Sequence, residues 1–181
     1  MPHINLPDGF PGITAGFAFR RETATPMRAL AEFLLRGPNT LTSAEREMIA
    51  AVVSSRNDCE FCQASHSAAA AHHLSGHYDV VDAVKRDYES APISGKLKAL
   101  LAITGKVQVS GRNVTVADVA RARTEGATDT EIHDAVLIAA AFSMFNRYVD
   151  GLATMTPTDP KVYDEMGQSM AHDGYLKPSR K

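Results

Sequence analysis

Residues 42–74 read TSAEREMIAAVVSSRNDCEFCQASHSAAAAHHL, and this stretch predicts two helices with a sharp turn between them. Thr42 and Glu45 have the spacing of a capping box, in which each side chain accepts a hydrogen bond from the other residue's backbone N–H. The Asn-Asp pair at 57–58 breaks this first helix and can cap a second one that starts at residue 59. The many alanines of the second helix favour both helix formation and close packing.

The turn leads directly into the two cysteines of the chain, Cys59 and Cys62. A Cys-x-x-Cys spacing is typical of redox sites and of metal sites. His66 follows Cys62 by four residues, one turn further along the same helix face. Both thiols fall in the first helical turn, where unpaired N–H groups and the helix dipole favour the thiolate. Two thiols beside a proton carrier indicate thiol–disulfide or peroxide chemistry.

Helix signals recur through the rest of the chain, and no stretch predicts a strand. Thr25 and Pro26 have the pattern of an N-cap followed by proline at the first helical position. Thr115 with Asp118, and Thr128 with Glu131, are predicted to open two further helices. Helices are expected over residues 25–36, 43–55, 59–75, 78–88, 94–107, 115–126 and 129–155. We therefore predict an all-α fold, a single-domain bundle of six to eight helices.

The predicted domain organisation has three parts. Residues 1–24 show little periodicity and several turn formers, so we expect an N-terminal extension that packs over the domain or over a partner subunit. The helical core domain covers residues 25–155 and contains the cysteine pair. Pro157 and Pro160 end the last helix, and the polar C-terminal tail, residues 156–181, is expected to be mobile or exchanged with a neighbouring subunit.

Charge and hydropathy exclude several classes of function. The formal net charge is −2 and there is no basic run, which argues against binding to nucleic acid or to an anionic membrane. The longest apolar run, residues 135–142, is too short to cross a bilayer, and the first residues lack the features of a secretory signal. We therefore expect a cytoplasmic protein, in which a close cysteine pair is more often catalytic or metal-binding than structural.

A histidine that carries protons usually needs a partner that orients it. Glu47 is the candidate, because it lies in an otherwise apolar stretch of the preceding helix and the turn would bring the two helices antiparallel. Glu45 is less suitable, since the capping box uses its carboxylate.

The spacing of these residues resembles a known family. Eleven residues separate Glu47 from Cys59, and three separate Cys62 from His66. This pattern resembles the alkyl hydroperoxidase D family of the carboxymuconolactone decarboxylase superfamily, especially its peroxidase-related branch, over residues 25–155. The resemblance implies an all-helical homo-oligomer (a dimer, trimer or hexamer) that needs no cofactor or metal. It would reduce hydroperoxides and be regenerated by an external dithiol.

The resemblance also implies a role for each residue of the motif. Cys62 would be the attacking thiol and Cys59 the resolving thiol. His66 would carry the proton, and Glu47 would orient it. The decarboxylases of the superfamily lack the cysteine pair, so lactone decarboxylation is not expected. Phe61 differs from the founding hydroperoxidases, which carry a histidine between the two cysteines, and it makes this end of the site more apolar.

Two other functions stay open on the residues alone. The cysteine pair could serve an electron-relay adaptor whose partner is a disulfide of another protein. It could also bind a metal in a structural oligomer, with His66 and His73 on the same helix face, but one straight helix cannot surround zinc tetrahedrally. The more reactive thiol is also open: the helix start favours Cys59, whereas the carboxylate of Asp58 and the spacing to His66 favour Cys62.

Overall fold

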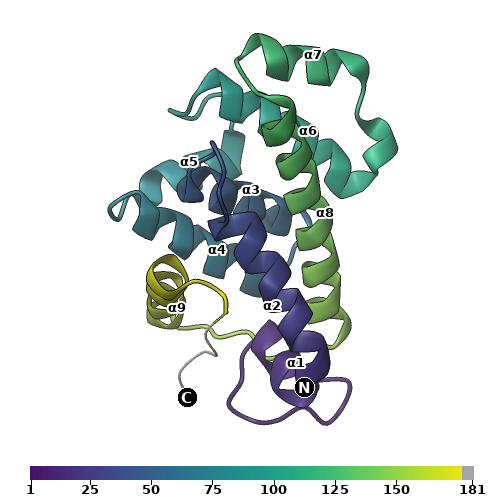
Figure 1. Cartoon of the computed structure of the whole chain (residues 1–181). Helices are drawn as coiled ribbons and strands as arrows, with labels where there is room; N and C mark the ends of the chain where they lie inside the picture. The colour runs from purple at the N-terminus through teal and green to yellow at the C-terminus, as the bar shows by residue number, and fades with distance from the viewer. Residues whose placement is uncertain (177–181) are drawn as a thin grey trace.

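The computed structural model describes residues 1–176, which form nine α-helices, one short 3-10 helix and no strand (Figure 1). The all-α prediction is confirmed, with more helices than expected because both ends of the chain are also helical. The elements are α1 (Ile13–Phe19), α2 (Arg21–Arg36), α3 (Ser43–Arg56), α4 (Glu60–His73), α5 (Tyr78–Asp87), α6 (Gly95–Val109), η1 (Gly111–Asn113), α7 (Val116–Thr124), α8 (Asp129–Gly151) and α9 (Pro160–Asp173).

The helix starts predicted at Thr42, Thr115 and Thr128 are confirmed. At the start of α3, the Thr42 hydroxyl accepts a hydrogen bond from the Glu45 backbone N–H (3.2 Å), and the Glu45 carboxylate accepts one from the Thr42 N–H (2.8 Å). The same reciprocal bonds open α7 at Thr115 and α8 at Thr128. Each box satisfies two backbone donors that a helix N-terminus otherwise leaves unpaired.

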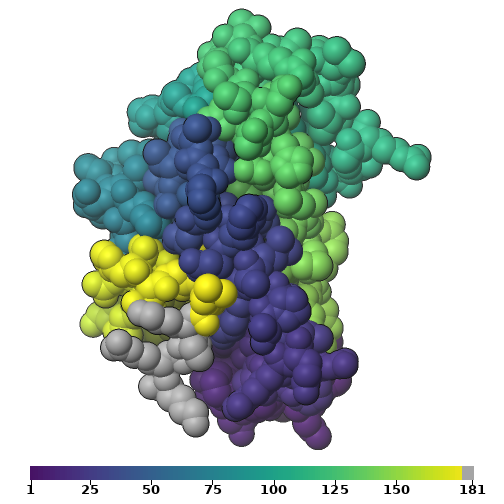
Figure 2. Space-filling model, in the orientation of Figure 1, coloured from purple at the N-terminus to yellow at the C-terminus, as the bar shows by residue number. Residues whose placement is uncertain are grey.

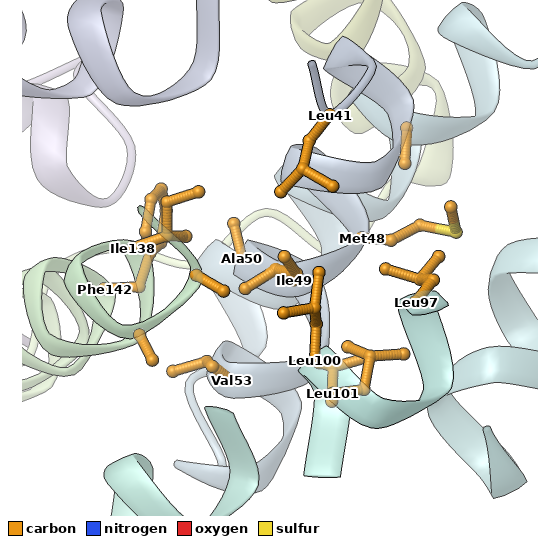
Figure 3. Close-up of a cluster of buried hydrophobic side chains, with 14 of the residues drawn as sticks. Leu41, Met48, Ile49, Ala50, Val53, Leu97, Leu100, Leu101, Ile138 and Phe142 are labelled. Carbon is orange, nitrogen blue, oxygen red and sulfur yellow. The ribbon is translucent and has the colours of Figure 1, made fainter. Parts of the chain in front are cut away.

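The core of the bundle is built around α3, which is buried along most of its length (Figure 3). Helix α3 packs against α4, α6 and α8. Ile49 and Val53 of α3 meet Leu100 of α6 and Phe142 of α8 in one apolar cluster. Burial of this apolar surface is the main favourable contribution to folding. This packing also fixes the position of α3, the helix that carries Glu47. No helix in residues 1–176 combines the length and apolar character that spanning a membrane requires.

The turn between α3 and α4 differs in detail from the prediction. Residues 57–58 do not cap α4; Cys59 itself occupies the N-cap position and has no side-chain cap. The Cys59 N–H donates instead to the carbonyl of Ser54 (3.0 Å). Asp58 adopts a left-handed backbone conformation (φ 57°), which aspartate tolerates better than most residues. The turn is tied to α8, because the Asn57 side-chain amide donates to Oδ1 of Asn146 (2.8 Å).

The start of the first long helix was predicted wrongly. Helix α2 begins at Arg21, so Thr25 is not its N-cap and Pro26 lies inside the helix. The Thr25 hydroxyl bonds back to the carbonyl of Arg21 (3.4 Å), as hydroxyls within helices often do. The N-terminal extension contains a helix of its own, α1. It packs on the rest of the chain, since the Gly12 N–H donates to the carbonyl of Met155 (2.9 Å).

The expectation of a mobile tail is wrong for residues 160–173, which form α9; residues 177–181 of that tail lie outside the described residues. The Asp159 carboxylate caps α9 and Pro160 takes its first position, an arrangement that starts a helix as readily as proline ends one. Helix α9 packs closely on α4. A Cβ atom added at Gly167 would lie only 2.5 Å from Cβ of Ala68, which shows how near the two helices are. Figure 2 shows the C-terminal helix on the surface beside the N-terminal part of the chain.

Candidate active site

The carboxylate of Glu47 is fully buried and lies against the imidazole of His66, as the sequence predicted. Nδ1 of His66 is 2.7 Å from Oε2 of Glu47. An ionised carboxylate can only accept hydrogen bonds, so Nδ1 carries the hydrogen and Nε2 is the nitrogen left to exchange a proton. The contact joins the middle of α3 to the second turn of α4, the two helices on either side of the sharp turn.

Two further donors, neither predicted from the sequence, bind the other oxygen of Glu47. Nη2 of Arg36, in the last turn of α2, donates to Oε1 (2.6 Å). The hydroxyl of Tyr175, just beyond α9, donates to the same oxygen (2.5 Å). Burial by itself raises the pKa of Glu47, but electrostatic interactions with His66 and Arg36 and the hydrogen bonds lower it to about 2. Glu47 is therefore ionised at neutral pH.

The ring of His66 contacts two aromatic side chains. It meets Phe142 of α8 edge-on, with the ring centroids 4.6 Å apart and the planes at 87°. It stacks with Tyr175 at 6.1 Å and 16°. These contacts and the bond to Glu47 leave the imidazole little freedom to rotate, so the direction of its free nitrogen is fixed by the fold.

The two cysteines are free thiols with different surroundings. Cys59 is completely buried, whereas Cys62 is 4% exposed and lines a cavity. Hydrogen bonding to Cys62, burial and a hydrogen bond with Asp150 raise the pKa of Cys59 above its ordinary value. The raised pKa of Cys59 works against the argument from the helix start, which favoured a thiolate there.

The cavity beside Cys62 and His66 has a volume of about 950 Å³. The loop and α1 at residues 8–17 form one wall, and α2 and α8 form others. The C-terminal segment, residues 157–176, contributes the wall between Val162 and Tyr175. Phe61, the residue between the cysteines, also lines the cavity and lies directly under Gly12 of the N-terminal loop. Both ends of the chain are thus parts of the candidate site.

The structure places Glu47 against His66 and Cys59 against Cys62, puts Cys62 and His66 on one cavity, and adds Arg36 and Tyr175 around Glu47. A basic residue in the last turn of a helix is common, because it complements the helix dipole, so Arg36 carried no distinguishing signal. An aromatic residue in a polar tail was the one available signal for Tyr175. His73 does not line the cavity. Among residues 1–176, no group of three or more His, Cys, Asp or Glu side chains is placed to hold a metal ion.

Comparison with known proteins gives a family. The sequence pattern of the Carboxymuconolactone decarboxylase family matches residues 21–74, which include α2, α3 and α4. No protein with a curated description matches the chain. The structure is similar to that of an uncharacterized peroxidase-related protein from Silicibacter sp. TM1040, with 30% sequence identity and a TM-score of 0.76. The match covers 85% of this chain and 78% of that one.

A second similar structure, from Ralstonia eutropha JMP134, is described as an alkylhydroperoxidase AhpD core and an uncharacterized peroxidase-related protein. It is 27% identical with a TM-score of 0.77, and the match covers 87% of this chain and 81% of that one. The identity and coverage of the first structure, together with the family pattern over the motif helices, establish the relationship. The chain belongs to the carboxymuconolactone decarboxylase superfamily and has the fold of its alkyl hydroperoxidase D-like, peroxidase-related members.

Proposed function

We propose that this protein is a thiol-dependent peroxidase, in which Cys62 attacks a hydroperoxide and Cys59 resolves the product. The observation that carries the proposal is the 2.7 Å contact between Nδ1 of His66 and Oε2 of Glu47 beside the thiol pair. A buried ionised carboxylate that orients a histidine one helical turn from a cysteine is an arrangement suited to activating that thiol. The peroxidase-related names of two similar structures support the same class of activity.

The first step transfers two electrons from Cys62 to the peroxide. Glu47 holds Nδ1 of His66, so Nε2 accepts the thiol proton of Cys62. The thiolate attacks the outer oxygen of the hydroperoxide, the sulfur–oxygen bond forms and the oxygen–oxygen bond breaks. The proton on His66 passes to the leaving oxygen, which departs as an alcohol, or as water when the substrate is hydrogen peroxide. Cys62 is left as a sulfenic acid.

The second step forms a disulfide and releases water. The thiol of Cys59 attacks the sulfenic sulfur of Cys62, and the hydroxyl group leaves with the Cys59 proton. Cys59 is at the N-cap, outside the regular helix, which gives its side chain the freedom to reach the neighbouring sulfur. An external dithiol then reduces the disulfide by two exchange steps and becomes a disulfide itself.

The cavity supports an organic hydroperoxide as the substrate. Its volume of about 950 Å³ lies at the upper end of the range for small-molecule sites and far exceeds what hydrogen peroxide needs. Its inner lining is largely apolar, with Phe61, Phe142 and Phe145 near the thiol. Cys62 is 4% exposed and borders this cavity. The cavity favours a peroxidase over an electron-relay adaptor, because a relay needs no small-molecule site beside its thiols.

The remaining expectations about partners stay proposals. We propose that the protein works in the cytoplasm and that it is a homo-oligomer. The second proposal is supported by apolar side chains exposed on α2 and α8, namely Phe33, Leu137 and Met144. Sedimentation of the purified protein measures the subunit count. A monomer at micromolar concentration would contradict this part of the proposal.

Mass spectrometry of the reduced protein treated with one equivalent of an organic hydroperoxide tests the function. We expect the two thiols to be lost together as one intramolecular disulfide. The Cys59→Ser protein should stop at the sulfenic acid of Cys62, and the Cys62→Ser protein should react slowly. Two intact thiols, or over-oxidation of one cysteine in the wild-type protein, would refute the mechanism. Fast exchange with a dithiol combined with inertness to peroxide would favour the relay adaptor instead.

A further inference from the structure

We propose that Tyr175 is a positioning residue for the Glu47–His66 pair, delivered to the site when the C-terminal segment (residues 157–176) closes over the thiols. The proposal rests on the proposed function, since it concerns how the same thiol is activated. It also assigns a second task to the segment, which is to open so that the oxidised pair can be reduced.

The hydroxyl of Tyr175 fixes the orientation of the Glu47 carboxylate. It donates to Oε1 of Glu47 at 2.5 Å and lies 3.4 Å from Nδ1 of His66. A carboxylate that is held at Oε1 presents Oε2 to the imidazole in one direction only. Without this donor, Oε1 keeps only the bond from Arg36, and the plane of the carboxylate is less constrained. Tyr175 therefore acts on the thiol through two intermediate side chains and need not touch the substrate.

The backbone of Tyr175 is anchored separately from its hydroxyl. The Tyr175 N–H donates to Oε2 of Glu32 (2.6 Å), and Nη1 of Arg28 donates to the Tyr175 carbonyl (3.2 Å). Both anchors come from α2. Glycine at position 174 lets the chain come close to Glu32. Its φ of +73° suits glycine, and a Cβ atom there would lie 2.5 Å from Oε2 of Glu32. The anchoring and the positioning can therefore be separated by mutation.

Helix α2 joins the closed segment directly to the relay. The guanidinium of Arg36 donates both to Oε1 of Glu47 (2.6 Å) and to the carbonyl of Met170 in α9 (2.9 Å). It also lies 5.2 Å from the centroid of the Tyr175 ring. The same side chain therefore binds the carboxylate and the segment that covers it. Closure of the segment and completion of the donor set around Glu47 are one event.

Closure and regeneration make opposite demands on the segment. In the closed structure Cys59 is fully buried and Cys62 is 4% exposed, and residues of α9 form a wall of the cavity that leads to Cys62. Disulfide exchange requires an attacking thiolate to approach a sulfur atom in line. The peroxide step suits the closed segment, because the set of donors around Glu47 is then complete. The reduction step requires the segment to move away.

The test measures alkylation of Cys62 in the full-length Cys59→Ser protein, where it is the one remaining thiol. A small reagent, iodoacetamide, reports thiol activation, and a maleimide on a polyethylene glycol chain reports access. The variants are Tyr175→Phe, which keeps the ring and backbone, and Glu32→Ala, which removes an anchor. Tyr78→Phe is the matched control, since its hydroxyl also donates to a carboxylate of α9, Asp164 (2.6 Å), away from Glu47.

We expect Tyr175→Phe to lower the iodoacetamide rate about tenfold near neutral pH, the usual scale for a hydrogen bond to a charged group. The loss should shrink at high pH, where the thiol ionises without a base, and the ratio of maleimide to iodoacetamide rates should not change. Glu32→Ala should raise that ratio about tenfold. Tyr78→Phe, which removes a bond to α9 but none to Glu47, should leave the iodoacetamide rate unchanged. Thermal unfolding confirms that each variant is folded.

An iodoacetamide rate in Tyr175→Phe equal to that in Tyr78→Phe would overturn the positioning role. An unchanged reagent ratio in Glu32→Ala would overturn the closing role. Neither measurement uses a peroxide, so they are independent of the proposed function. A wild-type protein that is inert to hydroperoxide, yet shows these alkylation differences, would refute the peroxidase and leave the role of Tyr175 intact.

Discussion

Replacing Glu47 by glutamine tests the centre of the site with a change of charge at constant volume. Glu47 is buried and receives hydrogen bonds from His66, Arg36 and Tyr175. The amide of glutamine can accept only on one side, so at least one of these donors loses its partner. The guanidinium of Arg36, whose side chain is 12% exposed, would also lose its counter-charge.

The size of the effect follows from the pKa of Glu47, which is about 2 in the folded protein against an ordinary value of 4.5. This depression corresponds to about 3 kcal/mol in favour of the folded state with an ionised carboxylate. Because the folded pKa is the lower one, the contribution is complete above pH 4.5 and is lost as the pH falls towards 2. Loss of one partner of a buried ion pair typically costs about 3–5 kcal/mol, which agrees with this figure.

Urea unfolding followed by circular dichroism, repeated at several pH values, measures the prediction. We expect Glu47→Gln to be about 3 kcal/mol less stable than the wild type near neutral pH, with a difference that shrinks in acid. Glu45→Gln is the control on the same helix, because glutamine also serves in a capping box and should cost little. A stability difference below about 1 kcal/mol, or one that does not change with pH, would show that the Glu47 contacts contribute little.

Three further substitutions test other parts of the structure. Gly167→Ala should push α9 away from α4, cost about 1–3 kcal/mol and raise the reaction rate of bulky maleimides with the site thiol, measured by mass spectrometry; an unchanged rate would contradict the close packing. Glu131→Gln should lower the melting temperature without changing thiol reactivity, because Glu131 binds Lys96 (2.7 Å) away from the site. Gly12→Ala should loosen the N-terminal loop, since φ is +53° and the new methyl group would overlap the ring of Phe61; limited proteolysis near the N-terminus should become faster.

Helices with complete local signals could be predicted from the sequence, and those whose boundaries depend on packing could not. The capping boxes at Thr42, Thr115 and Thr128 are local, and all three mark real helix starts. The Thr25-Pro26 pattern is equally local but misleading, because α2 extends further towards the N-terminus. Helix propensities differ between residue types by about 1 kcal/mol or less per residue, so tertiary packing decides where such a helix starts.

The candidate site was predictable only where its residues lie close in the sequence. Cys62 and His66 lie on α4, Cys59 is the N-cap residue of that helix, and Glu47 lies on the helix before it, so spacing could place these four residues near one another. Tyr175 reaches Glu47 across 128 positions of the chain, and nothing in its own neighbourhood indicates the contact. The contacts that residues near the ends of the sequence make with the site could be found only in the structure.

This long separation also bears on how the protein is made. The core helices α2 to α8 end at Gly151, so they leave the ribosome before Tyr175 does. Cys62 then has no C-terminal wall over it until Tyr175 has left the ribosome. The nascent chain therefore passes through an interval in which Cys62 lacks this wall and Glu47 lacks the hydrogen bond from Tyr175, so the thiol meets peroxide without the complete site of the finished protein.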